Sequence, residues 1–303
     1  MTLTRRDFVA GTAASLGLAA LTRQAALAAT GPDVVDVSGS SPAAMVGAAV
    51  AALGGIGRFV KRGDYVVLKA NAAFANPPEW GTTTHPETVV AMAKLCLEAG
   101  AKRVVVLEYP QAKGMKCLER CGLIAALAEV PAVQVKLLGA PDDFKEVKIP
   151  GGVACKSTEV AKALLSADVF INLPAAKAHD QTGVSLGLKN HMGLIRERQV
   201  FHTMMDLHQA VADLAQVVKP HLTLVDATRA LLTNGPAGPG DTSTPGRMAA
   251  GVNVVSVDAY ALTLARFNQR QMTPADARHI ALAAAAGLGE ADVAKLVVKK
   301  VTA

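Results

Sequence analysis

Short apolar runs alternate along the chain with longer segments that carry helical signals. The run at residues 65–68, bounded by Gly63-Asp64 and Asn71, predicts a buried strand, and further apolar runs predict strands at residues 104–107, 133–138, 169–173, 222–225, 252–255 and 294–298. The intervening segments predict helices at residues 42–56, 86–100, 117–128, 159–165, 202–218, 258–267 and 274–286. Such alternation is typical of an α/β fold, a layered, mostly parallel sheet with helices on both faces.

Residues typical of helix ends support several of these boundaries. Ser41 and Thr273 are suitable N-caps, Pro86 suits the first turn of a helix, and Gly100 suits its end. Residues 233–249 are rich in Gly and Pro and form the longest predicted loop, a candidate lid.

The N-terminal segment has the order of an export signal. The pair Arg5-Arg6 precedes an uncharged apolar stretch, residues 9–21, and Ala26-Leu27-Ala28 offers a cleavage site. The stretch is shorter than the roughly 18–20 residues of a membrane span, so no stable span is expected after cleavage. The paired arginines resemble the twin-arginine signal, which predicts folding in the cytoplasm, export by the twin-arginine translocase and a periplasmic location. An ordinary secretory signal is the alternative. Residues 1–28 are therefore interpreted as the signal, and residues 29–303 as a single α/β domain.

Composition narrows the class of protein. Hydrophobic residues make up 51% of the chain and aromatic residues 4%, which predicts a core of Ala, Val and Leu. The formal net charge of +6 is spread along the chain, and no run of Lys and Arg with interleaved aromatics occurs. Nucleic acid is therefore not an expected partner. The mild positive balance suits a small anionic ligand.

The four cysteines, Cys96, Cys117, Cys121 and Cys155, do not include a Cys-x-x-Cys pair. Their spacing argues against an iron–sulfur cluster. Cys117 and Cys121 would lie one turn apart on a helix, where a disulfide or half of a metal site is an alternative. The simplest interpretation is four unpaired thiols.

Polar side chains follow several of the predicted strands. In an open parallel sheet the ligand lies beyond the carboxyl ends of the strands, so side chains at these positions are expected to be functional. They are Lys69, Asn71, Glu108, Asn172, Lys177, His179 and Asp226.

Two further segments concentrate polar groups. Thr84 and His85 lead into a predicted helix, where they form either an anion site or a plain cap. Lys189 and Asn190 lie between two glycines, which let backbone approach a ligand closely.

Histidines are concentrated in the same part of the sequence, since four of the seven lie between residues 179 and 208. His202 and Asp206 are four residues apart and would share one face of the predicted helix 202–218. Asp258 is interpreted as a cap or first-turn residue.

The order of these motifs resembles a known family. Lys-x-Asn, Thr-Thr-His-Pro, Asn-x-Pro-x-x-Lys-x-His, Leu-Lys-Asn-x-Met-Gly, a later His and Val-Asp-Ala resemble domain of unknown function 362 over residues 34–270. Many relatives carry a ferredoxin-like module with cysteine quartets, a spacing that the cysteines of this chain lack. The resemblance indicates which residues belong to the family's motifs, but not what each residue does. These motif residues are Lys69, Asn71, Thr84, His85, Asn172, Lys177, His179, Lys189, Asn190, Gly193, His202, Asp226 and Asp258.

Our first hypothesis from the sequence is an enzyme whose Lys- and His-lined cleft takes an anionic small molecule. Its substrate-binding residues would be Lys69, Asn71, Thr84, Asn172, Lys189 and Asn190. Its catalytic residues would be His85, Lys177 and His179, as groups for proton transfer. In a variant of this hypothesis, a divalent metal is held by His179, His202 and Asp226.

Two alternatives stay open. One is a non-catalytic periplasmic accessory protein that binds a ligand or metal, favoured by the absence of a recognisable nucleophile or phosphate-loop motif. The other is an iron–sulfur-linked redox accessory. The sequence identifies neither the substrate nor the oligomeric state.

Overall fold

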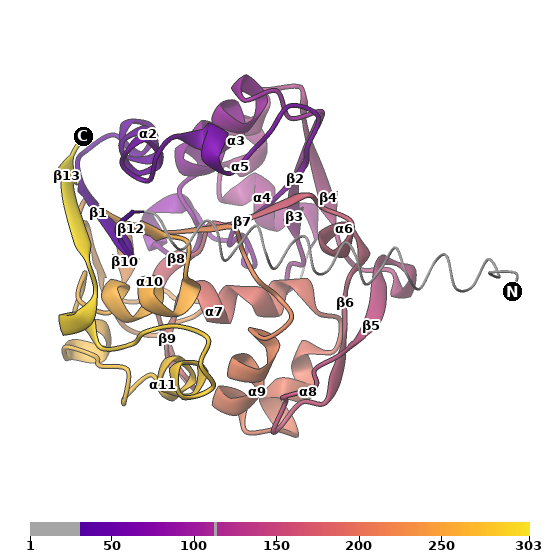
Figure 1. Cartoon of the computed structure of the whole chain (residues 1–303), viewed down its shortest axis with the longest axis vertical. Coiled ribbons are helices and arrows are strands. Elements are labelled where there is room, and N and C mark those ends of the chain that lie inside the picture. The colour runs from indigo at the N-terminus through magenta and orange to yellow at the C-terminus, as the bar shows by residue number, and fades with distance from the viewer. Residues whose placement is uncertain (1–30, 112–113) are drawn as a thin grey trace, which may run out of the picture.

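The computed structural model describes residues 31–111 and 114–303, and an 11-stranded sheet forms its centre (Figure 1). The signal expected for residues 1–28 lies outside the described residues. Along its main path the sheet has the order β13-β1-β12-β10-β7-β2-β3-β4. These strands are β1 (Val34–Ser38), β2 (Tyr65–Lys69), β3 (Arg103–Glu108), β4 (Val133–Leu137), β7 (Val169–Asn172), β10 (Leu222–Leu231), β12 (Arg247–Gly251) and β13 (Val298–Thr302).

Parallel pairing dominates the middle of the sheet. Strands β4, β3, β2, β7 and β10 pair with one another in parallel, and β1 pairs with β13 in parallel. Strand β12 runs antiparallel to both of its neighbours. The register places Lys69 beside Asn172, so the carboxyl ends of β2 and β7 meet at one edge. The predicted mostly parallel α/β sheet is confirmed.

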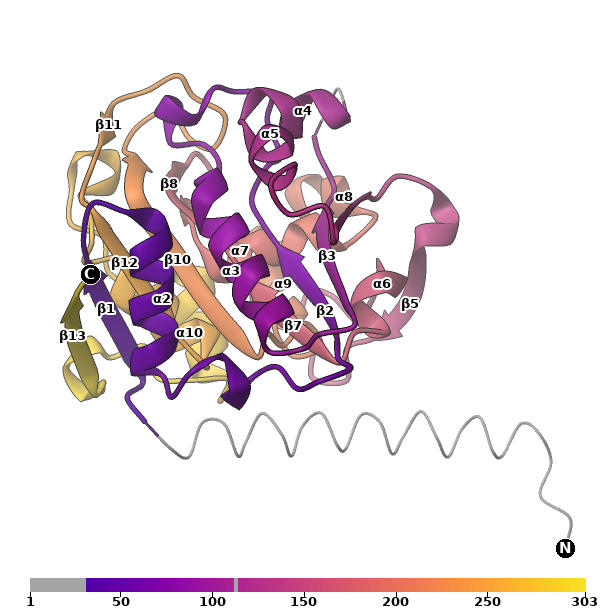
Figure 2. The same cartoon turned by 90° about the horizontal axis from the view of Figure 1, so that it is seen from above.

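Three short strands extend the sheet beside this edge. Strand β8 (Ala175–His179) pairs in parallel with β10 and antiparallel with β9 (Gly183–Ser185), and β11 (Thr242–Ser243) pairs with β10. A separate two-stranded sheet is formed by β5 (Phe144–Lys148) and β6 (Ser157–Ala161) at one side of the molecule (Figure 2).

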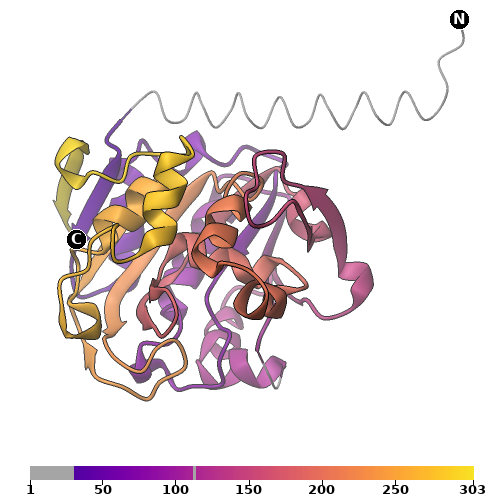
Figure 3. The same ribbon diagram turned by 90° about the horizontal axis from the view of Figure 1, so that it is seen from below.

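Helices cover both faces of the large sheet. One face carries α2 (Pro42–Ala52), α3 (Pro86–Glu98), α4 (Met115–Arg120) and α5 (Leu123–Leu127) (Figure 2). The opposite face carries α7 (Gly187–Asn190), α8 (Arg198–Thr203), α9 (Leu207–Leu214), α10 (Val254–Ala261) and α11 (Arg278–Ala285) (Figure 3). The short helix α6 (Lys162–Leu165) follows β6.

Side chains of the central strands alternate between two hydrophobic cores. In β2, Val66 and Leu68 belong to the core beneath α2 and α3, whereas Val67 belongs to the core beneath α9 and α10. All three are fully buried. Burying each such side chain stabilises the fold by about 1.5–3 kcal/mol. Because both faces of these strands are buried, their sequences are continuous apolar runs and do not alternate between apolar and polar residues.

Two predicted helix starts are confirmed in detail. Ser41 is the N-cap of α2, and its side chain accepts a hydrogen bond from the Ala44 N–H at 3.3 Å. Pro86 is the first residue of α3, with His85 as the N-cap. Helix α3 ends at Glu98, and Gly100 then takes a positive φ of 87°.

The prediction of one helix over residues 202–218 is wrong. Helix α8 ends at Thr203, and α9 begins after Asp206, whose side chain accepts hydrogen bonds from the N–H groups of His208 and Gln209. Asp206 therefore acts as an N-cap, which requires a non-helical backbone at that residue. His202 and Asp206 consequently do not share a helical face.

The predicted strand at residues 252–255 is wrong for a similar reason. Asn253 caps α10 by accepting hydrogen bonds from Val255 and Ser256, so the strand β12 lies before it. Residues 157–161, partly predicted as helix, pair with β5 as strand β6. The predicted helix 117–128 is divided into α4 and α5 at Gly122, where φ is 80°.

The C-terminal elements begin later than predicted. Helix α11 starts at Arg278, because Thr273 forms a turn in which it donates two hydrogen bonds to Asp276. Strand β13 starts at Val298, after a 3-10 turn at Val293–Lys295. In the part of the chain that the structure describes, no helix is long and apolar enough to cross a membrane.

Candidate functional site

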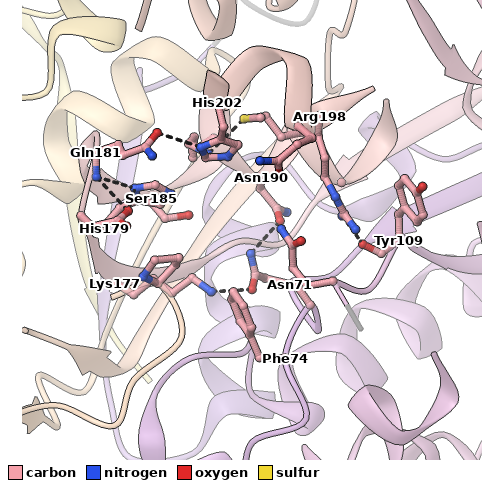
Figure 4. A pocket seen from close by; sticks show the side chains of 18 of the residues that line it. Asn71, Phe74, Tyr109, Lys177, His179, Gln181, Ser185, Asn190, Arg198 and His202 are labelled. Carbon is pink, nitrogen blue, oxygen red and sulfur yellow. Dashed lines mark hydrogen bonds and ion pairs between the residues drawn. The ribbon is translucent and has the colours of Figure 1, made fainter. Parts of the chain in front are cut away.

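A cavity of about 330 Å³ opens at the carboxyl edge of the sheet (Figure 4). Strands β2 and β3, the β8–β9 hairpin and helices α7 and α8 bring side chains to its wall. The basic and imidazole side chains among them are Lys69, Lys177, Lys189, Arg198, His179 and His202. Of the seven residues predicted from strand ends, five line this cavity, namely Lys69, Asn71, Glu108, Lys177 and His179, and Asn172 and Asp226 do not.

Lys69 and Glu108 form a buried ion pair at the floor of the cavity. The Lys69 Nζ lies 2.8 and 2.9 Å from the two carboxylate oxygens of Glu108, and both side chains are 1% exposed. Burial lowers the pKa of Lys69, whereas the Glu108 carboxylate opposes that shift. Glu108 also accepts hydrogen bonds from the backbone N–H groups of Ala72 and Tyr109, at 2.7 and 2.8 Å. All the strong acceptor capacity of Glu108 is thus in use within the fold.

Gly193 makes room for this ion pair. A Cβ at this position would lie 2.6 Å from the Lys69 Cε and 3.2 Å from the Glu108 Oε1. The second glycine of the segment that surrounds Lys189 therefore lets the backbone pass close to Lys69.

Three asparagines form a hydrogen-bonded chain along the edge of the sheet. Asn71 donates to the Asn190 Oδ1 at 3.0 Å, and Asn190 donates to the Asn172 Oδ1 at 2.8 Å. Asn172 in turn donates to the carbonyl of Gly187 at 3.0 Å. The chain joins the ends of β2 and β7 to α7, which makes these amides positioning groups for the neighbouring lysines.

Lys177 is buried in the middle of β8 without a carboxylate in contact. It is 1% exposed and donates to the Asn71 Oδ1 at 2.9 Å and to the Thr82 carbonyl at 2.6 Å. Its Nζ also lies 5.0 Å from the centre of the Phe74 ring. Burial, opposed by Glu108, lowers its pKa to about 7, and Lys69 and Lys189 add repulsion.

Lys189, on α7, is likewise a buried lysine without a carboxylate in contact. Its Nζ donates to the Met192 Sδ at 3.0 Å and lies 3.3 Å from the His202 Nε2, and the residue is 7% exposed. Burial lowers its pKa to about 7. The start of α7 is fixed by Asp258, which accepts hydrogen bonds from the N–H groups of Gly187 and Leu188, both at 2.8 Å.

Asp258 does not lie at the start of its own helix, contrary to the prediction. It is the fifth residue of α10 and is fully buried, and it caps α7 instead. Burial raises the pKa of its carboxyl group to about 7, opposed by the two N–H donors.

His179 and His202 stack in the cavity wall, with ring centres 5.9 Å apart and planes 13° from parallel. Burial lowers their pKa values to about 2 and about 4, and the nearby Lys189 lowers both further. Both rings are therefore neutral, and the 2.9 Å contact between the His179 Nδ1 and Asp180 is not an ion pair.

The tautomer of His202 follows from its neighbours. Its Nδ1 lies 2.9 Å from the Gln181 Oε1, which can only accept, so Nδ1 carries the proton. The neutral ring then presents the lone pair of Nε2 to Lys189.

Sequence reasoning missed Arg198, which lines the cavity from α8. Its guanidinium lies 4.1 Å from the centre of the Tyr109 ring and donates to the carbonyls of Tyr109 and Pro110. Its spacing could have identified it, since Arg198 precedes His202 by four residues and two residues at that spacing share one face of a helix.

Thr84 and His85 do not line the cavity. Thr84 donates to the Leu173 carbonyl at 2.6 Å and accepts from the Asn71 N–H at 2.9 Å. His85 caps α3, where its Nδ1 accepts from the Glu87 N–H at 3.2 Å. Of the two interpretations of this loop, its contacts match the structural cap.

The three residues of the metal variant are not brought together. His179 and His202 meet, but the oxygens of Asp226 accept from the His85 N–H, the Thr88 hydroxyl and Thr228 beside α3. Within residues 31–111 and 114–303, no group of three His, Cys, Asp or Glu side chains is arranged to hold a metal ion. All four cysteines are buried, and Cys96, Cys121 and Cys155 are free thiols.

Comparison with known proteins identifies relatives of this chain. The family model described as "Domain of unknown function (DUF362)" matches residues 66–263. The thylakoid-associated protein sll1697 of Synechocystis sp. is 30% identical over 220 residues, which cover 68% of this chain and 64% of that protein. The chain thus spans less than two thirds of this relative's length.

Two solved structures are more distant. The lactate racemase apoprotein of Thermoanaerobacterium thermosaccharolyticum gives a TM-score of 0.41 at 13% identity, covering 63% of this chain and 50% of that one. A Thermotoga maritima protein gives 0.36 at 13% identity, covering 59% and 48%.

Proposed function

The chain belongs to the family described as a domain of unknown function (DUF362), and we propose that its cavity binds a small anionic molecule. One observation carries the proposal: Lys177 and Lys189 are buried at 1% and 7% exposure, and the groups that contact them are all uncharged. Burying an ammonium group without a negative partner costs several kcal/mol. A bound anion would remove that cost.

The charge balance of the cavity wall supports the same conclusion. Glu108 neutralises Lys69, and both histidines are neutral. Asp180 is 67% exposed at the rim, and it opposes the effect of burial on the Lys189 pKa without reversing it. Arg198 supplies a positive charge, and Lys177 and Lys189, with pKa values of about 7, can each become fully charged beside an anion.

Calorimetric titration of the full chain with phosphate, acetate and small dicarboxylates tests the proposal. Lys177→Met and Lys189→Met should each weaken binding of the best anion by about tenfold or more. Lys145→Met, on the exposed face of β5, serves as the matched control and should bind normally. The proposal fails if no anion binds, or if all three variants bind as tightly as the parent.

Catalysis of proton transfer is the second candidate. The contact of 3.3 Å between Lys189 and the His202 Nε2 favours it, because an amine with a pKa of about 7 beside a neutral imidazole can exchange a proton near neutral pH. A bound anion whose carbon-bound hydrogens exchange with deuterated water only in the presence of the protein would support catalysis. A ligand that stays unexchanged would support a non-catalytic binding protein.

We also propose that the protein is exported to the periplasm by the twin-arginine route. The pair Arg5-Arg6 ahead of an uncharged apolar stretch supports this. Replacing both arginines by lysine should retain the protein in the cytoplasmic fraction. Unchanged recovery in the periplasm would refute this route.

A further inference from the structure

The two uncompensated amines of the cavity reach it from different elements. Lys177 is the third residue of β8, where it lies opposite Ser185 of β9. Lys189 lies on α7, which begins after this hairpin and is fixed by Asp258. The two side chains therefore enter the cavity from a strand and from a helix.

Their hydrogen-bond partners are also separate. Lys177 contacts Asn71 and the Thr82 carbonyl, whereas Lys189 contacts Met192 and His202. Across the described residues, no group is hydrogen-bonded to both amines, so each amine offers its own place for a negatively charged group.

We infer that the ligand carries two separate anionic groups, one bound at Lys177 and the other at Lys189, as in a small dicarboxylate. This inference rests on the proposed anion-binding function and specifies its ligand. A single anionic group could compensate one centre and would leave the other buried and unpaired. Glu108 is hydrogen-bonded to neither amine, because Lys69 and two backbone N–H groups already occupy its oxygens.

The size and lining of the cavity fit this class of ligand. Its volume of about 330 Å³ lies at the small end of the range for ligand pockets, which suits a short molecule. Phe74 lies beside Lys177 and Met192 beside Lys189, so apolar surface adjoins each charged centre. A short carbon skeleton with a carboxylate at each end matches that pattern.

Binding of such a ligand should take up protons. In the free protein both lysines have a pKa of about 7, so at pH 8 each is mostly the neutral amine. A carboxylate beside an amine raises its pKa, so the amine gains a proton on binding. A dicarboxylate should therefore take up close to two protons at pH 8, and its monoamide about one.

The experiment is calorimetric titration of the full chain at pH 8, in two buffers of different ionisation enthalpy. The probes are malonate, succinate and glutarate, each paired with its own monoamide, and inorganic phosphate as a compact anion. The expected result is that the best dicarboxylate binds at least about tenfold more tightly than its monoamide and takes up about one proton more. Lys177→Met and Lys189→Met should each abolish that difference.

Two results would overturn the inference while leaving the proposed function in place. In the first, each monoamide binds as tightly as its dicarboxylate with the same proton uptake. In the second, phosphate binds more tightly than every dicarboxylate. If none of the probes binds, the proposed function fails and the inference fails with it. The comparison of dicarboxylate with monoamide uses the parent chain alone, so it is decisive even if a variant does not fold.

Discussion

Lys189 and His202 contact each other across the cavity wall, with the Lys189 Nζ 3.3 Å from the His202 Nε2. Neither group contributes a full charge at neutral pH, because burial lowers the lysine pKa to about 7 and the histidine pKa to about 4. The contact is therefore one between an amine and a neutral imidazole. An anion beside the amine would raise its pKa, and this makes the pair responsive to an anionic ligand.

Lys189→Met should separate binding from stability. We expect anion affinity to fall by about tenfold or more, while the free energy of unfolding stays the same or rises, because a buried uncompensated amine is replaced by an apolar chain. Calorimetric titration and urea unfolding measure the two quantities. A loss of stability as large as the loss of binding energy would indicate a structural role for Lys189 instead.

Glu108→Gln should destabilise the fold. The substitution leaves the Lys69 ammonium buried without its carboxylate, so the free energy of unfolding should fall by about 3 kcal/mol. Glu129→Gln is the matched control, since its pair with Lys94 is at 3.8 Å and both side chains are largely exposed. That control should change stability by less than about 1 kcal/mol. Equal effects of the two substitutions in urea unfolding would contradict our interpretation of the Lys69–Glu108 pair.

Gly193→Ala should destabilise the protein by about 1–3 kcal/mol, because the added methyl group would lie 2.6 Å from the Lys69 Cε and the ion pair holds that side chain in place. Gly47→Ala is the opposite case. This glycine lies inside α2, and an added Cβ would meet no atom within 4 Å, so alanine should stabilise the helix by about 0.5–1 kcal/mol. Thermal unfolding of both variants checks the sign, and a stabilising Gly193→Ala would refute the close-contact argument.

The ligand-free protein should become more stable between pH 7 and pH 8. The unfolded chain keeps Lys177 and Lys189 protonated, with pKa values near 10.5, whereas the folded chain holds them at about 7. The unfolded state thus binds more protons in this window, so the free energy of unfolding rises with pH, by up to about 1.4 kcal/mol per pH unit for each lysine.

Urea unfolding at pH 7.0, 7.5 and 8.0 measures this slope. The double variant Lys177→Met, Lys189→Met should lose most of it. A parent protein whose stability falls or stays constant over this window would show that the two amines are not perturbed as described.

The sequence predicted the part of the site that depends on strand ends alone. Lys69, Asn71 and Glu108 all line the cavity at the carboxyl edge, because parallel neighbours in register bring the ends of β2 and β3 together. Asp226 follows the same sequence pattern but lies within β10, which continues to Leu231, and its carboxylate fixes the start of α3. A sequence pattern cannot separate these cases, since both place a polar residue after an apolar run.

The errors in the helices have a local cause. Asp206 separates α8 from α9 through a side-chain cap, without a Gly or Pro to mark the break, and Asn253 starts α10 by the same kind of cap two residues after Gly251. The same error explains why Arg198 was not predicted as a site residue. The predicted helix began at His202, so it did not include the turn of α8 that carries Arg198. The β8–β9 hairpin was missed because its strands are short and its alternation is interrupted by charged side chains.

The most direct test of the central claim is to measure the pKa values of Lys177 and Lys189 by NMR of the side-chain amines, with and without a saturating small dicarboxylate. Lys→Met variants assign the two signals. We expect both amines to titrate near pH 7 in the free protein and several units higher when the anion is bound. Two amines that titrate near 10.5 in the free protein, and that do not respond to any anion, would contradict the account.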